Sequence, residues 1–97
     1  MNKQQKVSME NFCRAVLALE NMDECRAFFE DAFTYQEAET IANRFEVANL
    51  LIEGKNYTEV NEKTGASTAT ISRVNRALNY GNGGYRTVIE RLEKKNG

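Results

Sequence analysis

Residues 57–78 read YTEVNEKTGASTATISRVNRAL, and they predict two short helices joined by a tight turn. Gly65 can adopt the positive φ that such a turn requires, and Ser67 is placed to cap the second helix. Apolar packing between the two helices would come from Val60, Ile71, Val74 and Leu78. This layout is a helix-turn-helix, with a second helix over 67–78 that carries small hydroxyl residues and two arginines.

Charge is distributed unevenly along the 97 residues, although the formal net charge is only −1. Residues 1–40 hold four basic and eight acidic residues, net −4, whereas residues 41–97 hold nine and six, net +3. No acidic residue lies between Lys63 and Ile89, a stretch that includes Arg73, Arg76 and Arg86. A solvated basic face is one interpretation, but beside a helix-turn-helix the local positive field favours binding to a phosphate backbone.

The composition argues against several classes of protein. Cys13 and Cys25 are the only cysteines and there is no histidine, so we expect no metal site and two cysteines packed as small hydrophobes in a reducing cytoplasm. We expect no signal peptide and no membrane span. The stretch 81–84 lacks the lysine and hydroxyl of a phosphate-binding loop and the carboxylates are scattered, so we do not expect an enzyme.

Apolar residues recur at spacings of three and four throughout a chain without proline, which predicts an all-α fold. A first helix is expected from an N-cap at Ser8, and a second from Asn21 or Asp23. Their predicted apolar sides contain Phe12, Cys13, Val16, Leu17 and Leu19 in the first helix, and Cys25, Phe28, Phe29, Ala32 and Phe33 in the second. Together with Phe45, we interpret these phenylalanines as core or subunit interface rather than a platform for nucleic-acid bases.

A capping box of Thr34 and Glu37 predicts the start of a third, longer helix that ends near Glu53, with Gly54 as its C′ residue. After the helix-turn-helix, residues 79–84 contain three glycines and interrupt the pattern, either as a plain flexible connector or as a hinge for the second helix. A last helix over 85–95 should fray into the charged tail from Glu93. We therefore predict a single domain over 1–97, with dimerisation helices at 8–54, that gains buried surface as an oligomer.

A second helix laid in the major groove would present its first turn to base edges and later residues to bases or phosphates. The DNA-binding candidates are Lys63, Ser67, Thr68, Ala69, Thr70, Ser72, Arg73 and Arg76. A solvent-facing role is the alternative for each individual serine and threonine.

Over about residues 33–92 the chain resembles the bacterial Trp repressor family, and its YerC/YecD branch most closely. The resemblance is carried by Phe-Thr-Tyr-Gln-Glu-Ala at 33–38, by a helix with Arg44 that leads to Leu-Ile-Glu-Gly at 51–54, and by Thr-Gly-Ala-Ser-Thr-Ala-Thr-Ile-Ser-Arg at 64–73. It implies an all-helical, intertwined homodimer of about six helices per chain, whose two-fold symmetry suits a near-palindromic operator.

The resemblance also implies positions for a ligand. Residues that contact tryptophan in the tryptophan-sensing relatives correspond to Thr34, Arg44 and Arg73 here, although Arg44 could instead form a salt bridge within the dimer, with Glu37 or Glu46. The relatives' glycine beside the indole is replaced by Val74, and their serine that meets the ligand amino group by Ala77. Loss of that bond costs about 1–3 kcal/mol and overpacking a similar amount. We therefore expect that tryptophan is not the corepressor.

These observations lead us to expect a cytoplasmic, sequence-specific DNA-binding transcriptional regulator of the repressor type, with double-stranded DNA and a second copy of the chain as partners. The alternative is a helical protein–protein interaction module with weak, unspecific nucleic-acid binding, which the acidic N-terminal half would tolerate.

Overall fold

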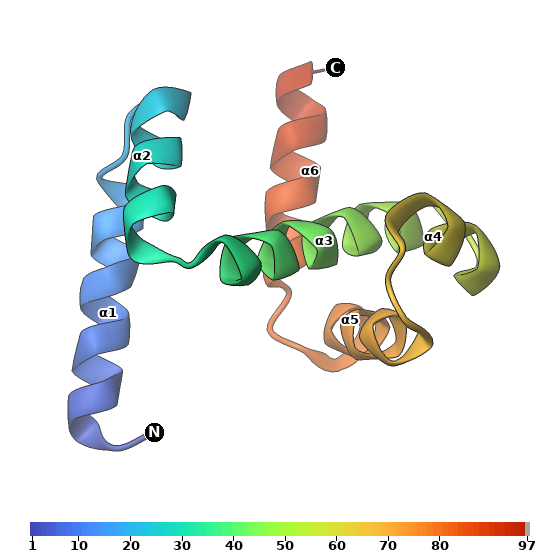
Figure 1. Cartoon of the computed structure of the whole chain (residues 1–97), viewed down its shortest axis with the longest axis horizontal. Helices are drawn as coiled ribbons and strands as arrows, with labels where there is room; N and C mark the ends of the chain where they lie inside the picture. The colour runs from blue at the N-terminus through green and yellow to red at the C-terminus, as the bar shows by residue number, and fades with distance from the viewer. Residues whose placement is uncertain (97) are drawn as a thin grey trace. The chain divides into compact units, whose positions relative to one another are not determined.

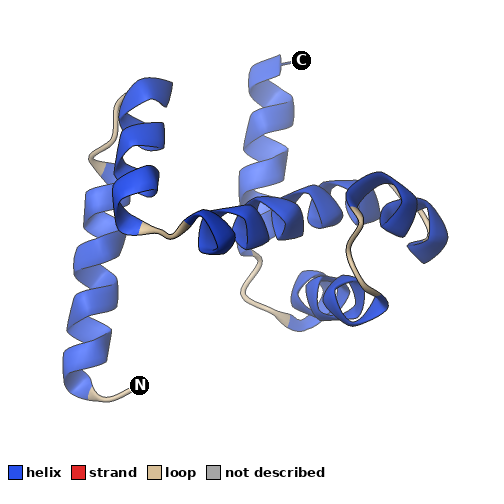
Figure 2. Ribbon diagram, in the orientation of Figure 1, coloured by secondary structure: helices blue, strands red, loops and turns tan. Residues whose placement is uncertain are grey.

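The computed structural model describes residues 1–96, and every regular element in that range is an α-helix (Figures 1 and 2). The described helices are α1 (Lys3–Leu17), α2 (Met22–Ala32), α3 (Tyr35–Ile52), α4 (Tyr57–Thr64), α5 (Thr68–Tyr80) and α6 (Gly84–Asn96). The predicted all-α class is confirmed. Among the described helices, none combines the length and the apolar character needed to cross a membrane. The chain divides into two compact units, Met1–Ala38 and Glu39–Gly97.

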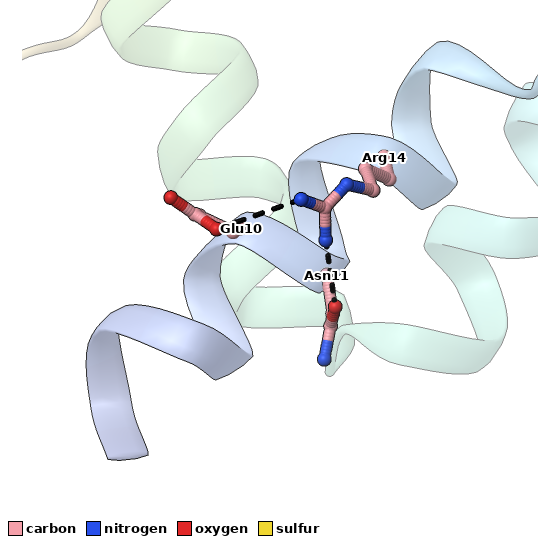
Figure 3. A network of polar contacts seen from close by, with 3 residues as sticks. All are labelled: Glu10, Asn11 and Arg14. Atoms are coloured by element: carbon pink, nitrogen blue, oxygen red, sulfur yellow. Dashed lines mark hydrogen bonds and ion pairs between the residues drawn. The ribbon is translucent and has the colours of Figure 1, made fainter. Parts of the chain in front are cut away.

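In the N-terminal unit, α1 begins earlier than predicted. The Asn2 side chain accepts a hydrogen bond from the Gln5 N–H at 2.8 Å, and the Gln5 side chain accepts one from the Asn2 N–H at 2.9 Å. The predicted start at Ser8 is wrong, because this capping box already satisfies the first orphan N–H groups upstream. Farther along α1, Arg14 pairs with Glu10 at 3.6 Å and donates to Asn11 at 3.1 Å (Figure 3).

A cluster of phenylalanine rings joins α1 to α2. The Phe12 ring centroid lies 5.8 Å from that of Phe28 and 6.1 Å from that of Phe33, and the Phe29 and Phe33 centroids are 5.2 Å apart. These distances are those of stacked and edge-to-face aromatic pairs. The α2 helix starts where Asn21 accepts from the Glu24 N–H at 2.9 Å, so the first of the two predicted caps is confirmed.

Two predictions for α1 are wrong: Cys13 and Leu17 are exposed, Leu17 by 84%. The half-buried positions of α1 are Phe12, Ala15 and Val16, which follow one another at helical spacing, and Leu19, just beyond the end of the helix, is half-buried as well. Cys13 and Leu17 each stand one residue past that stripe, about 100° around the helix. Ala32 of α2 is exposed as well.

The predicted ends of α3 are confirmed. The Thr34 hydroxyl accepts from the Glu37 N–H at 3.1 Å, and the Glu37 carboxylate accepts from the Thr34 N–H at 2.8 Å. The Thr34 backbone N–H holds the pKa of this carboxyl below its ordinary value, and the Thr34 side chain adds to the effect. At the other end Gly54 has φ +91°, and the N–H groups of Gly54 and Lys55 donate to Leu51 and Leu50, which is a Schellman motif.

The core of the C-terminal unit combines α3, α4, α5 and α6. Its buried members are Val47, Ala48, Val60, Ala66, Ile71, Val74, Leu78 and Ile89. Phe45 packs against this core, as its predicted role as a core or interface residue required. The last helix, predicted over 85–95, begins at Gly84 and continues to Asn96. Gly97 lies outside the described residues.

Gly81 ends α5 by a close backbone approach. Its N–H donates to the Ala77 carbonyl at 2.9 Å, and a Cβ added at Gly81 would clash with the same oxygen. Gly84, at the start of α6, has open space at its Cβ position and no positive φ. The two glycines therefore differ in what a methyl group would meet.

We expect Gly81→Ala to destabilise the protein by about 1–3 kcal/mol, because the end of α5 must move to relieve the clash. Gly84→Ala is the matched control and should be neutral or stabilising by up to about 1 kcal/mol, since it only restricts the unfolded chain. Urea denaturation followed by circular dichroism measures both. Equal stability of the two variants would contradict the close approach at Gly81.

Candidate nucleic-acid interface

The helices α4 and α5 and the turn between them form the predicted helix-turn-helix (Figure 1). Asn56 caps α4 by accepting from the Glu59 N–H at 2.9 Å, and Glu59 accepts from the Asn56 N–H at 3.3 Å. Gly65 follows α4 with φ +72°, the left-handed conformation that a residue with a side chain rarely adopts. Ser67 then caps α5 by accepting from the Thr70 N–H at 3.2 Å.

Side-chain amides hold the carbonyl groups of this turn. Asn43 of α3 donates to the Thr64 carbonyl at 2.9 Å, and Asn61 of α4 donates to the Ala66 carbonyl at 2.8 Å. The Thr64 hydroxyl accepts from the Ala66 N–H at 3.1 Å. The role of Asn43 is not predictable from the sequence, because no local pattern marks a bond to a residue 21 positions away.

The two helices are packed through one apolar side. The predicted contacts Val60, Ile71, Val74 and Leu78 are all buried. The other side of α5 carries candidate DNA-binding residues that are exposed: Thr68, Ala69, Ser72, Arg73 and Arg76. Lys63, in the last turn of α4, is exposed as well, and Thr70 is half-buried. Helix α5 therefore exposes small and basic side chains to solvent, while the apolar side chains on its opposite side are buried in the core.

Ser67 and Thr70 are partly committed to the fold. Besides capping α5, the Ser67 hydroxyl donates to the Thr70 hydroxyl at 3.2 Å. A hydroxyl that already accepts from a backbone N–H has less capacity left for a base edge. Of the first-turn candidates, Thr68 and Ala69 are thus the ones without such a structural role.

Three arginines line one open cavity of about 520 Å³ beside α5. Its walls are Arg44 of α3 and Ala69, Thr70, Ser72, Arg73 and Arg76 of α5. No acidic residue is part of this lining. The buried Nε of Arg44 has no hydrogen-bond partner within the described residues. The cavity is suited to an anionic group, which could satisfy such a donor.

Arg44 and Arg73, which the resemblance associated with a ligand, both line this cavity, whereas Val74 and Ala77 are not part of its lining. Thr34 belongs to the N-terminal unit and caps α3. Val74 is 1% exposed and lies in the core. Ala77 lines a different, mainly apolar cavity of about 550 Å³ with Phe45, Gly81, Asn82, Gly84, Tyr85 and Val88.

Comparisons with known proteins agree with this geometry. The model of the family "Trp repressor protein" matches residues 7–93. The uncharacterized protein YerC of Bacillus subtilis is 43% identical over 86 residues, which cover 89% of this chain and 83% of the relative.

Two solved structures share the fold over nearly their whole length. A TrpR-like protein from Eubacterium eligens superposes with a TM-score of 0.88 and 52% identity, covering 95% of this chain and 96% of the other. A candidate Trp repressor from Staphylococcus aureus gives a TM-score of 0.86 and 35% identity, covering 96% of each chain.

We expect Asn43→Ala to lower the free energy of unfolding by about 1–3 kcal/mol, because it leaves the part-buried Thr64 carbonyl without its partner. Asn11→Ala, which removes an exposed amide that accepts a hydrogen bond from Arg14, should change stability by less than about 0.5 kcal/mol. Chemical denaturation compares the two. The turn would not depend on Asn43 if both variants unfolded at the wild-type midpoint.

Proposed function

This chain belongs to the Trp repressor family, a family of DNA-binding regulators, and we propose that it regulates transcription, as a repressor, by binding a near-palindromic operator through α5. The observation that carries the proposal is that α5 has one buried apolar side and one exposed side with basic residues. One side is buried through Ile71, Val74 and Leu78, while the other exposes Arg73 and Arg76 beside short polar side chains. A helix held in this way can enter the major groove without rearrangement of the core.

We further propose that the regulator acts as a homodimer. No residue of α1 or α2 is buried, although both helices carry large apolar side chains. Exposed apolar residues within the described chain include Val7, Met9, Leu17 and Met22 in the N-terminal unit and Ile41, Val88 and Leu92 in the C-terminal unit. Apolar surface of this extent favours association, and a second copy of the chain would cover it symmetrically.

In the proposed complex Thr68 and Ala69 face base edges, and the Ala69 methyl and the threonine methyl suit a thymine methyl group. Arg73 pairs with a guanine or a phosphate, while Ser72, Arg76 and Lys63 hold the backbone. Hydroxyl groups discriminate weakly between bases, so water-mediated contacts and DNA shape contribute to specificity.

The alternative function is a helical protein–protein interaction module. It is supported by the acidic residues of the N-terminal unit and by a sequence pI of about 5.5. A regulator loses DNA affinity steeply with salt yet retains a preferred site, whereas an interaction module shows neither property. Family membership favours a cytoplasmic regulator with no catalytic role.

A selection of bound duplexes from a random DNA pool tests the proposal directly. We expect the purified protein to enrich a two-fold symmetric motif. If no motif is enriched with or without added tryptophan, the interaction module is favoured instead, or a regulator that requires another corepressor.

We propose that tryptophan is not that corepressor. Val74 occupies the core with 1% of its surface exposed, so it cannot move aside without cost, and Ala77 offers no side-chain hydrogen bond. The arginine-lined cavity remains a place for another small anionic ligand. Arg44 and Arg73 are the residues that would hold it.

We expect Arg73→Ala to weaken binding to the selected operator at least about 100-fold, since each half-site loses a contact worth about 1–3 kcal/mol. Arg91→Ala, an exposed arginine of α6, is the matched control and should bind nearly as wild type. Fluorescence anisotropy measures the affinities. Sedimentation should show the same oligomeric state for all three proteins, and undiminished operator affinity of Arg73→Ala would contradict the role of α5.

We expect isothermal titration calorimetry to show no tryptophan binding at micromolar concentrations. The double variant Val74→Gly, Ala77→Ser, if it remains folded, should bind tryptophan at least about tenfold more tightly than wild type, because it restores space and a hydrogen-bond partner. Micromolar affinity of the wild-type protein would overturn this proposal.

A further inference from the structure

Arg86 crosses the glycine-containing connection between α5 and α6. Its Nε donates to the Leu78 carbonyl at 3.2 Å, a part-buried bond between residues eight positions apart. Leu78 belongs to the last turn of α5 and is itself in the core. The bond therefore ties the first turn of α6 directly to the end of the helix that carries the candidate DNA-binding residues.

The Leu78 carbonyl is one of the four that a helix leaves without a partner at its C-terminus. Gly81 donates to the preceding carbonyl, that of Ala77. Helix α5 has no basic residue in its own last turn, so Arg86 brings a positive charge to the negative end of its dipole from the next helix. This is a cap supplied across a loop.

The backbone of the connection offers little stiffness of its own. Residues 81–83 contain two glycines, Gly83 has φ +79°, and Gly84 opens the next helix. The Thr87 hydroxyl donates to the Gly83 carbonyl at 3.0 Å, but this hydrogen bond stabilises only the start of α6. Within the described residues, Arg86 provides the side-chain hydrogen bond that joins the two helices across the loop.

We propose that Arg86 is a positioning residue: its bond to the Leu78 carbonyl fixes the angle of α5 and so determines how strongly the protein prefers its operator over random DNA. The proposal rests on the proposed function. A helix whose angle varies still meets phosphates through its arginines, but it places its first turn poorly against base edges. Loss of the bond should thus reduce discrimination more than unspecific affinity.

Arg86 carries a charge, so a phosphate contact is the competing role. Two substitutions distinguish the hydrogen bond to Leu78 from a phosphate contact. They differ in the atom that is bonded to Cδ, which in arginine is the donor Nε. Arg86→Gln keeps an N–H donor on the atom attached to Cδ and removes the charge. Arg86→Lys keeps the charge and puts a methylene group at the position of the donor.

The experiment measures affinity for the selected operator and for a scrambled duplex over a range of salt concentrations. We expect Arg86→Lys to lose roughly tenfold in the operator-to-scrambled ratio, the effect of one charge-assisted hydrogen bond, with an unchanged salt slope. Arg86→Gln should keep most of the ratio. Arg91→Lys and Arg91→Gln, on the exposed surface of α6, should match wild type.

A second measurement needs no DNA. Amide hydrogen exchange at Gly81, whose N–H bonds to Ala77, reports closure of the end of α5. We expect faster exchange in Arg86→Lys and near-wild-type exchange in Arg86→Gln. Normal exchange and discrimination in Arg86→Lys, or a salt slope reduced by about one in Arg86→Gln with loss of affinity for both duplexes, would overturn the positioning role.

The two measurements also separate this proposal from the proposed function. If the wild-type protein preferred no DNA sequence, that result would contradict its proposed function as a sequence-specific regulator. The exchange rates would still decide whether Arg86 holds the end of α5.

Discussion

The apolar contact between α4 and α5 is the constraint on which the candidate interface depends. Val60, Ile71 and Val74 are almost fully buried, and each such side chain stabilises the fold by about 1.5–3 kcal/mol relative to exposure. Because a helix has 3.6 residues per turn, fixing these positions also fixes which side chains face away. Arg73, immediately before Val74, is exposed for this reason.

Polar side chains satisfy the carbonyl groups at the helix ends that the apolar core leaves without partners. The core determines which side of α5 is buried, but it does not by itself satisfy the carbonyl groups where the helices end. Asn43 and Asn61 bind the carbonyls of the turn before α5, and Arg86 binds a carbonyl at its far end. Side chains of neighbouring helices therefore hold both the turn that leads into α5 and the last turn of α5. Recognition of base edges needs placement of this kind, whereas contact with phosphates tolerates more movement.

The N-terminal unit presents the opposite situation. Its phenylalanines contact one another, yet none of the residues in α1 and α2 is buried. A pair of helices with so little buried surface is marginal by itself. This is the physical argument for a second chain, and it connects the proposed two-fold assembly to a two-fold operator. The excess of acidic residues also lies in this unit, whereas α5 contains no acidic residue.

The sequence by itself determined the helix-turn-helix, because its signals are local. Gly65, the cap at Ser67 and the spacing of Val60, Ile71, Val74 and Leu78 act over a few residues, and the capping box of Thr34 and Glu37 is equally local. The predicted start of α1 at Ser8 was wrong, because a capping box of Asn2 and Gln5 begins the helix upstream of it. Only the tertiary structure decided which side of α1 is half-buried and that Asn43 and Arg86 bind distant carbonyls. Those contacts join residues that no periodic pattern relates, so they exist only once the helices have packed.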